Sequence, residues 1–213
     1  MARLARYIED NGYYHVISRS INHAWIFKDE ADFLRFRMLE RKAKQRFPIR
    51  LFHYVFMNTH FHLVLQASTK TTLSAHLAYV KWHYTQWMRR KYGWRGPLWR
   101  ERYKSLPIEN ESYLTACGTY VECNPVRAGM CRDPADYPFS SYRKYHQGLA
   151  DDIVDEYEAA GSPETLMLVN YETANAKAIF SRASAIGSPW FIEEYRSKRN
   201  ACPQKCSLGT FFL

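Results

Sequence analysis

Two neighbouring runs of apolar and aromatic residues constrain the fold of this chain more than any other feature. Residues 50–57 (RLFHYVFM) and 60–66 (HFHLVLQ) each have the length and composition of a β-strand, and only Asn58 and Thr59 separate them. A connection of two residues joins antiparallel strands in a hairpin. The segment therefore predicts two adjacent strands of an antiparallel sheet.

The segments around this hairpin complete a β-α-β-β-α-β order that is followed by one more helix. Asp29 and Asn110 are placed to cap the first and third helices, and Gly93 is placed to end the second. The expected strands are residues 13–18, 50–57, 60–66 and 98–107, and the expected helices are residues 29–45, 73–92 and 111–123. This order is typical of the ferredoxin-like α+β fold, an antiparallel sheet with helices on one face. The other face would be open for a ligand.

The chain has 213 residues, enough for one such domain and an extension. We expect the domain to span residues 1–148 and the C-terminal extension to span residues 149–213. The extension begins with an acidic segment, residues 151–172, which holds seven Asp and Glu residues and no Lys or Arg. It ends in a helical tail that Ser188 would cap.

His60 and His62 lie two residues apart in the third expected strand, so their side chains share one face. Phe61 and the two leucines that follow it point to the other face, which fits the core, and the imidazoles are therefore expected on the open face. Two imidazoles at this spacing can bind one divalent ion. The same sequence pattern is also found in pairs of histidines that are solvated or hydrogen-bonded. The other histidines, His15 among them, show no partner pattern and are expected to be structural or exposed.

Tyr120 and Asn124 lie four residues apart near the end of the third expected helix, so they project from the same helix face. If this face lies over the sheet, a phenol and an amide oxygen come close to the imidazoles. Mixed nitrogen and oxygen ligands suit Mg²⁺ or Mn²⁺. Such an ion could polarise a phosphodiester, and the phenol could then attack it.

The charge of the chain points to a polyanionic partner. The chain holds 30 Lys and Arg against 21 Asp and Glu, a net charge of +9, and the acidic segment contributes seven of the acidic residues. Cations neutralise phosphates, and aromatic rings stack on unpaired bases, although a solvated surface with a few core aromatics has the same composition. The densest basic stretch supplies the DNA-binding candidates Arg89, Arg90, Lys91, Arg95, Arg100, Arg102 and Lys104, with Trp94 and Trp99 between them.

These residues resemble a known superfamily. His60-Phe61-His62 resembles the His-hydrophobe-His motif of the HUH endonucleases, and Tyr120 with residues 124–129 (NPVRAG) resembles the tyrosine helix of the single-tyrosine HUH transposases. Within that group the chain is most similar to the REP-associated tyrosine transposases, because the flanking motifs agree. These motifs are residues 14–20 (YHVISRS), 96–105 (GPLWRERYKS) and 137–142 (YPFSSY). The residues before His60 are Met-Asn-Thr, where the family pattern has Met-Pro-Asn.

The resemblance implies an enzyme that nicks single-stranded DNA at or near a hairpin, forms a 5′-phosphotyrosine and can rejoin the ends. It implies Tyr120 as the nucleophile and His60, His62 and Asn124 as ligands of Mg²⁺ or Mn²⁺. The implied partner is single-stranded or hairpin DNA in the bacterial cytoplasm, near the nucleoid, with the protein acting as a monomer or homodimer. No membrane partner and no small-molecule cofactor are expected.

Two other functions remain open on the sequence alone. One is a non-catalytic protein that binds structured DNA or RNA on a ferredoxin-like sheet, although the aromatic string of RNA-recognition modules is absent. The other is a metal-dependent phosphodiesterase that forms no covalent intermediate. A trapped covalent adduct between protein and DNA would distinguish all three.

Overall fold

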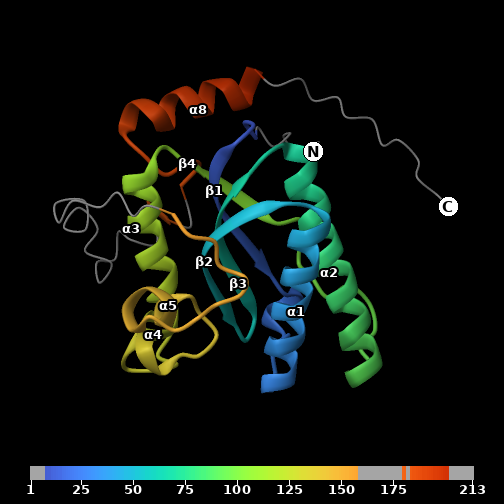
Figure 1. Ribbon diagram of the computed structural model, residues 1–213. Helices are drawn as coiled ribbons and strands as arrows, with labels where there is room; N and C mark the ends of the chain where they lie inside the picture. Colours follow the sequence, from blue (N-terminus) through green and yellow to red (C-terminus); the bar gives the residue numbers. More distant parts are fainter. Residues whose placement is uncertain (1–7, 158–178, 181–182, 202–213) are drawn as a thin grey trace.

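The computed structural model describes residues 8–157, 179–180 and 183–201. Its centre is a four-stranded antiparallel sheet with the strand order β2-β3-β1-β4 (Figure 1). The strands are β1 (Gly12–Arg19), β2 (Ile49–Met57), β3 (His60–Ala67) and β4 (Lys104–Ile108). The turn at Asn58 and Thr59 joins β2 to β3, as the sequence predicts, and the strand order is that of the ferredoxin-like fold.

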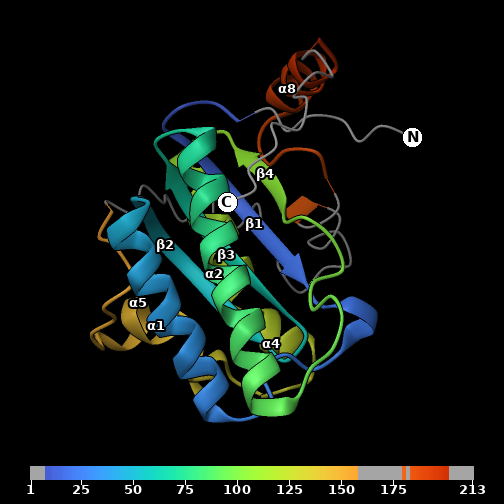
Figure 2. The ribbon, with the colours of Figure 1, turned by 90° about the vertical axis from the view of Figure 1, so that its right-hand side faces the viewer.

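The first face of the sheet is covered by α1 (Glu30–Arg46) and α2 (Lys70–Tyr92), which lie side by side over it (Figure 2). The predicted caps are confirmed. The Asp29 side chain accepts a hydrogen bond from the backbone of Asp32, and Gly93 ends α2 at φ 62°. Aromatic side chains from both helices and from the sheet fill this core, and they include Phe27, Phe36, Phe56, Phe61 and Tyr84.

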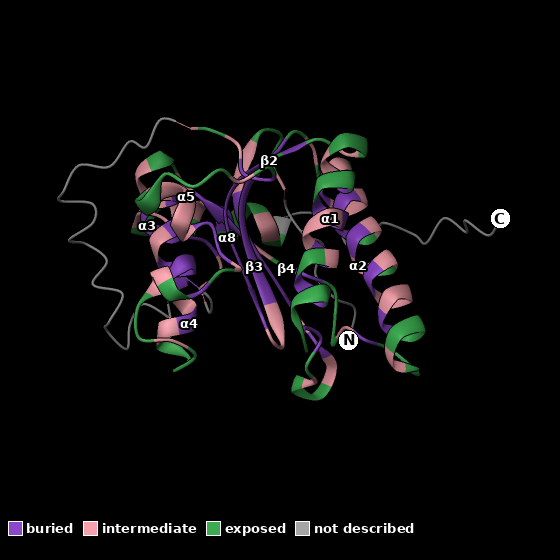
Figure 3. Ribbon diagram, turned by 60° about the horizontal axis from the view of Figure 1, so that its bottom comes forward, coloured by how far each residue is buried: buried purple, intermediate pink, exposed green. Residues whose placement is uncertain are grey.

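The second face of the sheet is covered by α3 (Glu111–Glu122), whose first turn is capped by Asn110. A second core lies here, and it includes Ile17, Val55, Val64, Leu114 and Tyr120. The sheet is therefore buried between helices on both sides, as Figure 3 shows. The expectation that the histidine-bearing face is open is wrong where α3 lies. This helix follows β4, and it buries its apolar side chains against that face of the sheet.

Residues 98–103 are also not the strand that the sequence predicts. They form an irregular loop in which only Trp99 pairs with β-type geometry, opposite Ser20. The backbone N–H of Arg100 donates to Arg19 O at 3.0 Å, and that of Ile21 donates to Leu98 O at 3.0 Å. These bonds hold the loop against the end of β1, so the regular pairing of β4 begins only at Lys104.

Short elements and one further helix complete the described chain. The 3-10 helix η1 (Ile21–His23) follows β1, α4 (Asn124–Arg127) follows α3, and η2 (Pro134–Asp136) and α5 (Tyr142–Gln147) come after it. The tail helix α8 (Pro189–Ala201) begins where the sequence predicts, since Ser188 Oγ accepts from the N–H of Phe191. No helix among the described residues has both the length and the apolar composition needed to cross a membrane.

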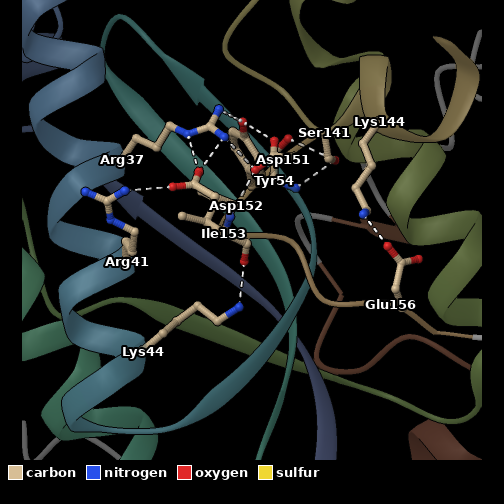
Figure 4. Close-up of polar contacts among 10 residues, drawn as sticks. All are labelled: Arg37, Arg41, Lys44, Tyr54, Ser141, Lys144, Asp151, Asp152, Ile153 and Glu156. Atoms are coloured by element: carbon tan, nitrogen blue, oxygen red, sulfur yellow. Dashed lines mark hydrogen bonds and ion pairs between the residues drawn. The ribbon is translucent and has the colours of Figure 1, made fainter. Parts of the chain in front are cut away.

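The start of the acidic segment packs against α1 and the edge of β2 (Figure 4). Asp152 forms ion pairs with Arg37 and Arg41, and Asp155 pairs with Lys44. Ile153 between them is buried in the first core. Residues 158–172, the rest of the predicted acidic segment, lie outside the described residues, and the boundary at residue 148 stays a prediction.

Candidate active site

The two histidines of β3 lie on the face of the sheet that α3 covers. His62 stands opposite Ile17 of β1 and Val55 of β2, and its side chain is 1% exposed. His60 is half-buried at the start of the strand, opposite Arg19. The centroids of the two imidazole rings are 5.1 Å apart. The alternation of side chains along a strand therefore places both imidazoles together, as expected from the sequence.

A third histidine, His15 of β1, completes this group. Its Nε2 lies 2.8 Å from Nδ1 of His62, and its Nδ1 lies 2.7 Å from the carbonyl oxygen of Phe180. His15 is thus buried and hydrogen-bonded, in agreement with the expectation that it is structural or exposed, but the sequence did not indicate that its partner is His62. His15 precedes Ile17, the strand partner of His62, by two residues, so the two imidazoles are diagonal neighbours on one face. Only the pairing register of β1 and β3 reveals this.

Burial keeps the imidazoles of His15 and His62 neutral. It lowers the pKa of His15 from its ordinary value to about 3. Burial also lowers the pKa of His62 well below its ordinary value, and the charges of His15, His60, Arg19 and Arg127 act in the same direction. A neutral imidazole keeps one lone pair in the plane of the ring, which is the form that binds a metal ion.

Tyr120 of α3 lies against the histidine group. Its ring meets the ring of His15 edge-on at 6.3 Å between centroids, and it is 2% exposed. The ring of Phe180 stacks on it, and the guanidinium carbon of Arg127 lies 4.0 Å from its centroid. Arg127 also donates a hydrogen bond to the backbone oxygen of Tyr120. The Tyr120 ring thus lies beside the imidazole of His15 and one cation, and it is buried.

Asn124 begins α4, one helical turn after Tyr120. Its Nδ2 donates to the backbone oxygens of Tyr120 at 3.2 Å and of Val121 at 3.1 Å. Backbone oxygens can only accept hydrogen bonds, so these contacts show which end of the Asn124 amide is the NH₂ group. The other end, Oδ1, is the atom that could bind a cation. The Asn124 amide is thus fixed against the end of α3, the helix that carries Tyr120.

The donor set fits a hard or borderline divalent ion. Within the described part of the chain, no group of three or more His, Cys, Asp or Glu residues is arranged to hold a metal. A metal at this place would therefore be bound by the two imidazoles of His60 and His62 together with oxygen from Asn124 or water. Such a mixed set is compatible with Mn²⁺ or Mg²⁺, which take oxygen ligands readily and keep water in their coordination.

The basic candidates divide into two groups. Lys91 is ion-paired with Asp29 and Asp32, and the indole of Trp99 donates to the backbone oxygen of Lys81. Trp94 packs on the edge of the first core. Contacts within the protein therefore engage these three side chains. The second group holds the remaining candidates, which are exposed residues: Arg89, Arg90, Arg95, Arg100, Arg102 and Lys104.

Two of the exposed candidates, Arg100 and Lys104, lie close to residues of the histidine group. The backbone of Arg100 is bonded to Arg19, which faces His60 across the strands. Lys104 stands opposite Ile17, and partial burial together with the charges of Arg19 and Arg199 lowers its pKa. Arg19 and Arg127, which the sequence-based selection missed, add positive charge beside His62. The site therefore has the electrostatic character expected for a phosphodiester ligand.

Comparisons with known proteins found a matching family and similar solved structures. Residues 9–124 match the family described as "Transposase IS200 like", a span that includes His60, His62, Tyr120 and Asn124. A solved structure of a REP-associated tyrosine transposase bound to a REP hairpin is similar over 76% of this chain and 98% of that chain, with 21% identity and a TM-score of 0.60. At that identity the likeness concerns the fold.

A second solved structure, a putative transposase from Deinococcus radiodurans R1, is 18% identical and covers 53% of this chain and 89% of its own, with a TM-score of 0.39. No curated protein matches. The family match spans more than half of the sequence, which confirms the resemblance seen in the motifs and implies a role in DNA cleavage and transposition. The chain belongs to the family of IS200-like transposases.

Proposed function

We propose that this transposase nicks single-stranded DNA at hairpin sequences and rejoins the ends through a covalent bond between Tyr120 and a 5′-phosphate. The observation that carries the proposal is the place of Tyr120 on α3. Its ring lies edge-on to His15, which is hydrogen-bonded to His62. The phenol would supply the nucleophile, and the imidazole bonded to His15, that of His62, would be a metal ligand for the attack on a phosphodiester.

His60, His62 and the amide oxygen of Asn124 would hold the divalent ion, Mg²⁺ or Mn²⁺, and imidazole ligands favour Mn²⁺. When bound, the ion would stabilise the negative charge that develops on the phosphodiester oxygens. The hydrogen bonds from Asn124 Nδ2 to the backbone orient its amide and so support its oxygen as the third donor.

In the cleavage step, the Tyr120 oxygen attacks phosphorus and the bond from phosphorus to the 3′-oxygen breaks. The phenol loses its proton, and the departing 3′-oxygen takes one up to become a hydroxyl. The new phosphotyrosine ester keeps the energy of the broken bond, so attack by a 3′-hydroxyl reverses the step and rejoins the ends. Arg127, which lies over the Tyr120 ring, would stabilise the phenolate as its charge develops.

Groups around the start of β3 are placed to hold the DNA. Arg19 faces His60, and Arg100 follows it through a backbone hydrogen bond. Trp25 is 59% exposed and precedes Ile26, whose N–H donates to Asn58 O in the turn before His60. Cations would contact the phosphates, and an exposed indole would stack on an unpaired base. A hairpin with single-stranded flanks is the DNA form that suits both contacts.

One observation favours a second function, which is hairpin binding without cleavage. Tyr120 is almost wholly buried and Phe180 covers its ring, so DNA reaches the phenol only after the Phe180 side chain moves. If that movement does not occur, the protein binds DNA but does not cut it.

A covalent-capture experiment distinguishes the two functions. The protein is incubated with Mn²⁺ and a hairpin oligonucleotide carrying a single-stranded flank, and adducts are resolved on denaturing gels. We expect the wild type and Tyr113→Phe, a control on the same helix, to form an adduct that maps to the peptide containing Tyr120. Tyr120→Phe should bind the hairpin with unchanged affinity and form none. An adduct that persists in Tyr120→Phe, or wild-type binding with no adduct, would contradict the proposal.

A further inference from the structure

A line of hydrogen bonds connects the histidine group to the C-terminal extension. It runs from the carbonyl oxygen of Phe180 to Nδ1 of His15 at 2.7 Å, and from Nε2 of His15 to Nδ1 of His62 at 2.8 Å. Both imidazoles and Phe180 are almost completely buried, with exposures of 0% for His15, 1% for His62 and 0% for Phe180. The carbonyl oxygen at the end of this line determines which nitrogen atoms of the two imidazoles carry protons.

A backbone carbonyl can only accept a hydrogen bond, so Nδ1 of His15 carries a proton. A neutral imidazole carries one proton, which makes Nε2 of His15 an acceptor. Nδ1 of His62 must then be the donor in the second bond. The single proton of His62 is thereby placed on Nδ1, and its lone pair is placed on Nε2. Both rings are buried away from water, which disfavours the positive charge that a second proton would bring to either of them.

We propose that His15 is a positioning residue that holds His62 as the Nδ1–H tautomer and so presents the Nε2 lone pair to the divalent ion. The inference rests on the proposed function, in which His62 is a metal ligand. Hydrogen bonds to the remote nitrogen of a ligating histidine fix its tautomer and ring orientation, and their loss typically weakens metal binding about 10–100-fold.

The neighbouring histidine, His60, makes a contact of a different kind at its Nδ1 atom. Nδ1 of His60 lies 2.9 Å from the hydroxyl of Thr59. A hydroxyl can donate or accept, so this contact fixes neither tautomer. The hydrogen bonds through His15, in contrast, end at a carbonyl oxygen, so only one tautomer of His62 is compatible with them.

The first test needs no metal and no variant. Histidine side chains are labelled with ¹⁵N, and long-range ¹H–¹⁵N correlation spectra of the metal-free protein identify the protonated nitrogen of each ring. We expect His15 and His62 both to carry the proton on Nδ1. A proton on Nε2 of His62 would overturn the proposal.

The second test removes the hydrogen bond between His15 and His62. In His15→Phe, a ring of similar size lacks both nitrogens, so His62 should lose its preference for the Nδ1–H form and Mn²⁺ affinity, measured by electron paramagnetic resonance, should fall about 10–100-fold. His53→Phe is the matched control, because His15 and His53 flank the same residue, Val64, from the two neighbouring strands, and His53 bonds to Glu122 rather than to His62.

The outcomes separate the two proposals. Unchanged tautomer and Mn²⁺ affinity in folded His15→Phe would overturn the positioning role. An equal loss of affinity in His53→Phe would overturn it too, because the effect would then be structural. Nδ1–H on His62 together with no Mn²⁺ binding by the wild type would support the tautomer assignment and overturn the proposed metal-dependent function instead.

Discussion

The ring of Phe180 stacks on the ring of Tyr120, with centroids 4.8 Å apart and planes inclined by 28°. The two residues come from different parts of the chain, since Tyr120 belongs to α3 and Phe180 to the C-terminal extension. The carbonyl of Phe180 also accepts the hydrogen bond from His15. One residue of the extension thus contacts both the phenol and the histidine group.

Removing the Phe180 ring should expose Tyr120. We expect Phe180→Ala to form the covalent DNA adduct several-fold faster per folded molecule, because the phenol no longer waits for the ring to move. The fully buried ring also stabilises the fold, so the variant should lose about 3–5 kcal/mol in the free energy of unfolding. Rates are measured under conditions where circular dichroism shows the variant to be folded.

Ile186→Ala is the control for this experiment. Ile186 belongs to the same extension and is buried in the second core, so its truncation should destabilise the protein without uncovering the phenol. Equal acceleration in both variants would attribute the effect to general loosening rather than to the Phe180 ring.

The metal assignment predicts loss of cleavage with retention of binding. His60→Ala and His62→Ala should reduce Mn²⁺-dependent adduct formation below detection, and a chelator should do the same to the wild type. Hairpin affinity should change little, because phosphate contacts position DNA independently of the metal. His23→Ala, which alters an exposed histidine of η1, is the control and should cleave normally. Full cleavage by the double variant in chelator would refute the assignment.

The buried carboxylate of Glu122 predicts a loss of stability in acid. Burial alone would raise its pKa, but the charge of His53 and hydrogen bonds from His146, His53 and Ser141 lower it to about 2. A carboxyl pKa below its ordinary value stabilises the fold above that ordinary value, near 4.5, and the stabilisation is lost as the pH falls toward 2. A shift of this size corresponds to about 3 kcal/mol.

Urea unfolding of the wild type and Glu122→Gln between pH 6 and pH 2 tests this. The variant should be less stable at pH 6, and the difference should shrink as the pH falls from about 4.5 to about 2. Asp136→Gln removes an exposed carboxylate and should show no such convergence. A wild-type advantage that stays constant down to pH 2 would show that the carboxylate of Glu122 is not responsible.

The ion pairs of Figure 4 predict that the acidic segment reduces non-specific DNA binding. Asp152 pairs with Arg37 at 2.6 Å and with Arg41 at 3.0 Å. Asp152→Asn should release part of this charge and tighten binding to a random oligonucleotide at low salt, with the gain lost at high salt. Stability should fall by about 1 kcal/mol or less, because the pairs are largely exposed.

Asp136→Asn is the matched control, since it changes the net charge equally and Asp136 forms no ion pair among the described residues. Fluorescence anisotropy at two salt concentrations compares the variants. If Asp136→Asn tightens binding as much as Asp152→Asn, net charge explains the effect and the ion pairs do not.

The sequence alone determined the local structure of this protein. Side-chain alternation fixed the faces of β3, and the capping residues Asp29 and Asn110, with Gly93, fixed where helices begin or end. The spacing of Tyr120 and Asn124 predicted that the two residues are one helical turn apart, and the Asn124 amide does donate to the backbone oxygen of Tyr120. These signals act between residues that are near one another in the chain, so they can be read without knowing how distant segments pack.

The tertiary structure decided which distant residues meet. The hydrogen bond between His15 and His62 depends on the register of β1 against β3, and the contact of His15 with Phe180 joins residues 165 positions apart. The sequence predicts Lys91 as a DNA contact. In the structure, the packing of α1 against α2 places Lys91 in ion pairs with Asp29 and Asp32.

Residues 98–103 have the composition of a strand but form a loop, because hydrogen bonds to Arg19 and Ile21 replace regular pairing there. The register of paired strands depends on the free energy gained when large apolar surfaces are buried. The same holds for the packing of helices and for the contact of a remote segment with a site. No short pattern in the sequence encodes that free energy. Tyr120 could therefore be proposed as the nucleophile from the sequence, whereas its contact with Phe180 and the hydrogen bond between His15 and His62 could not be predicted.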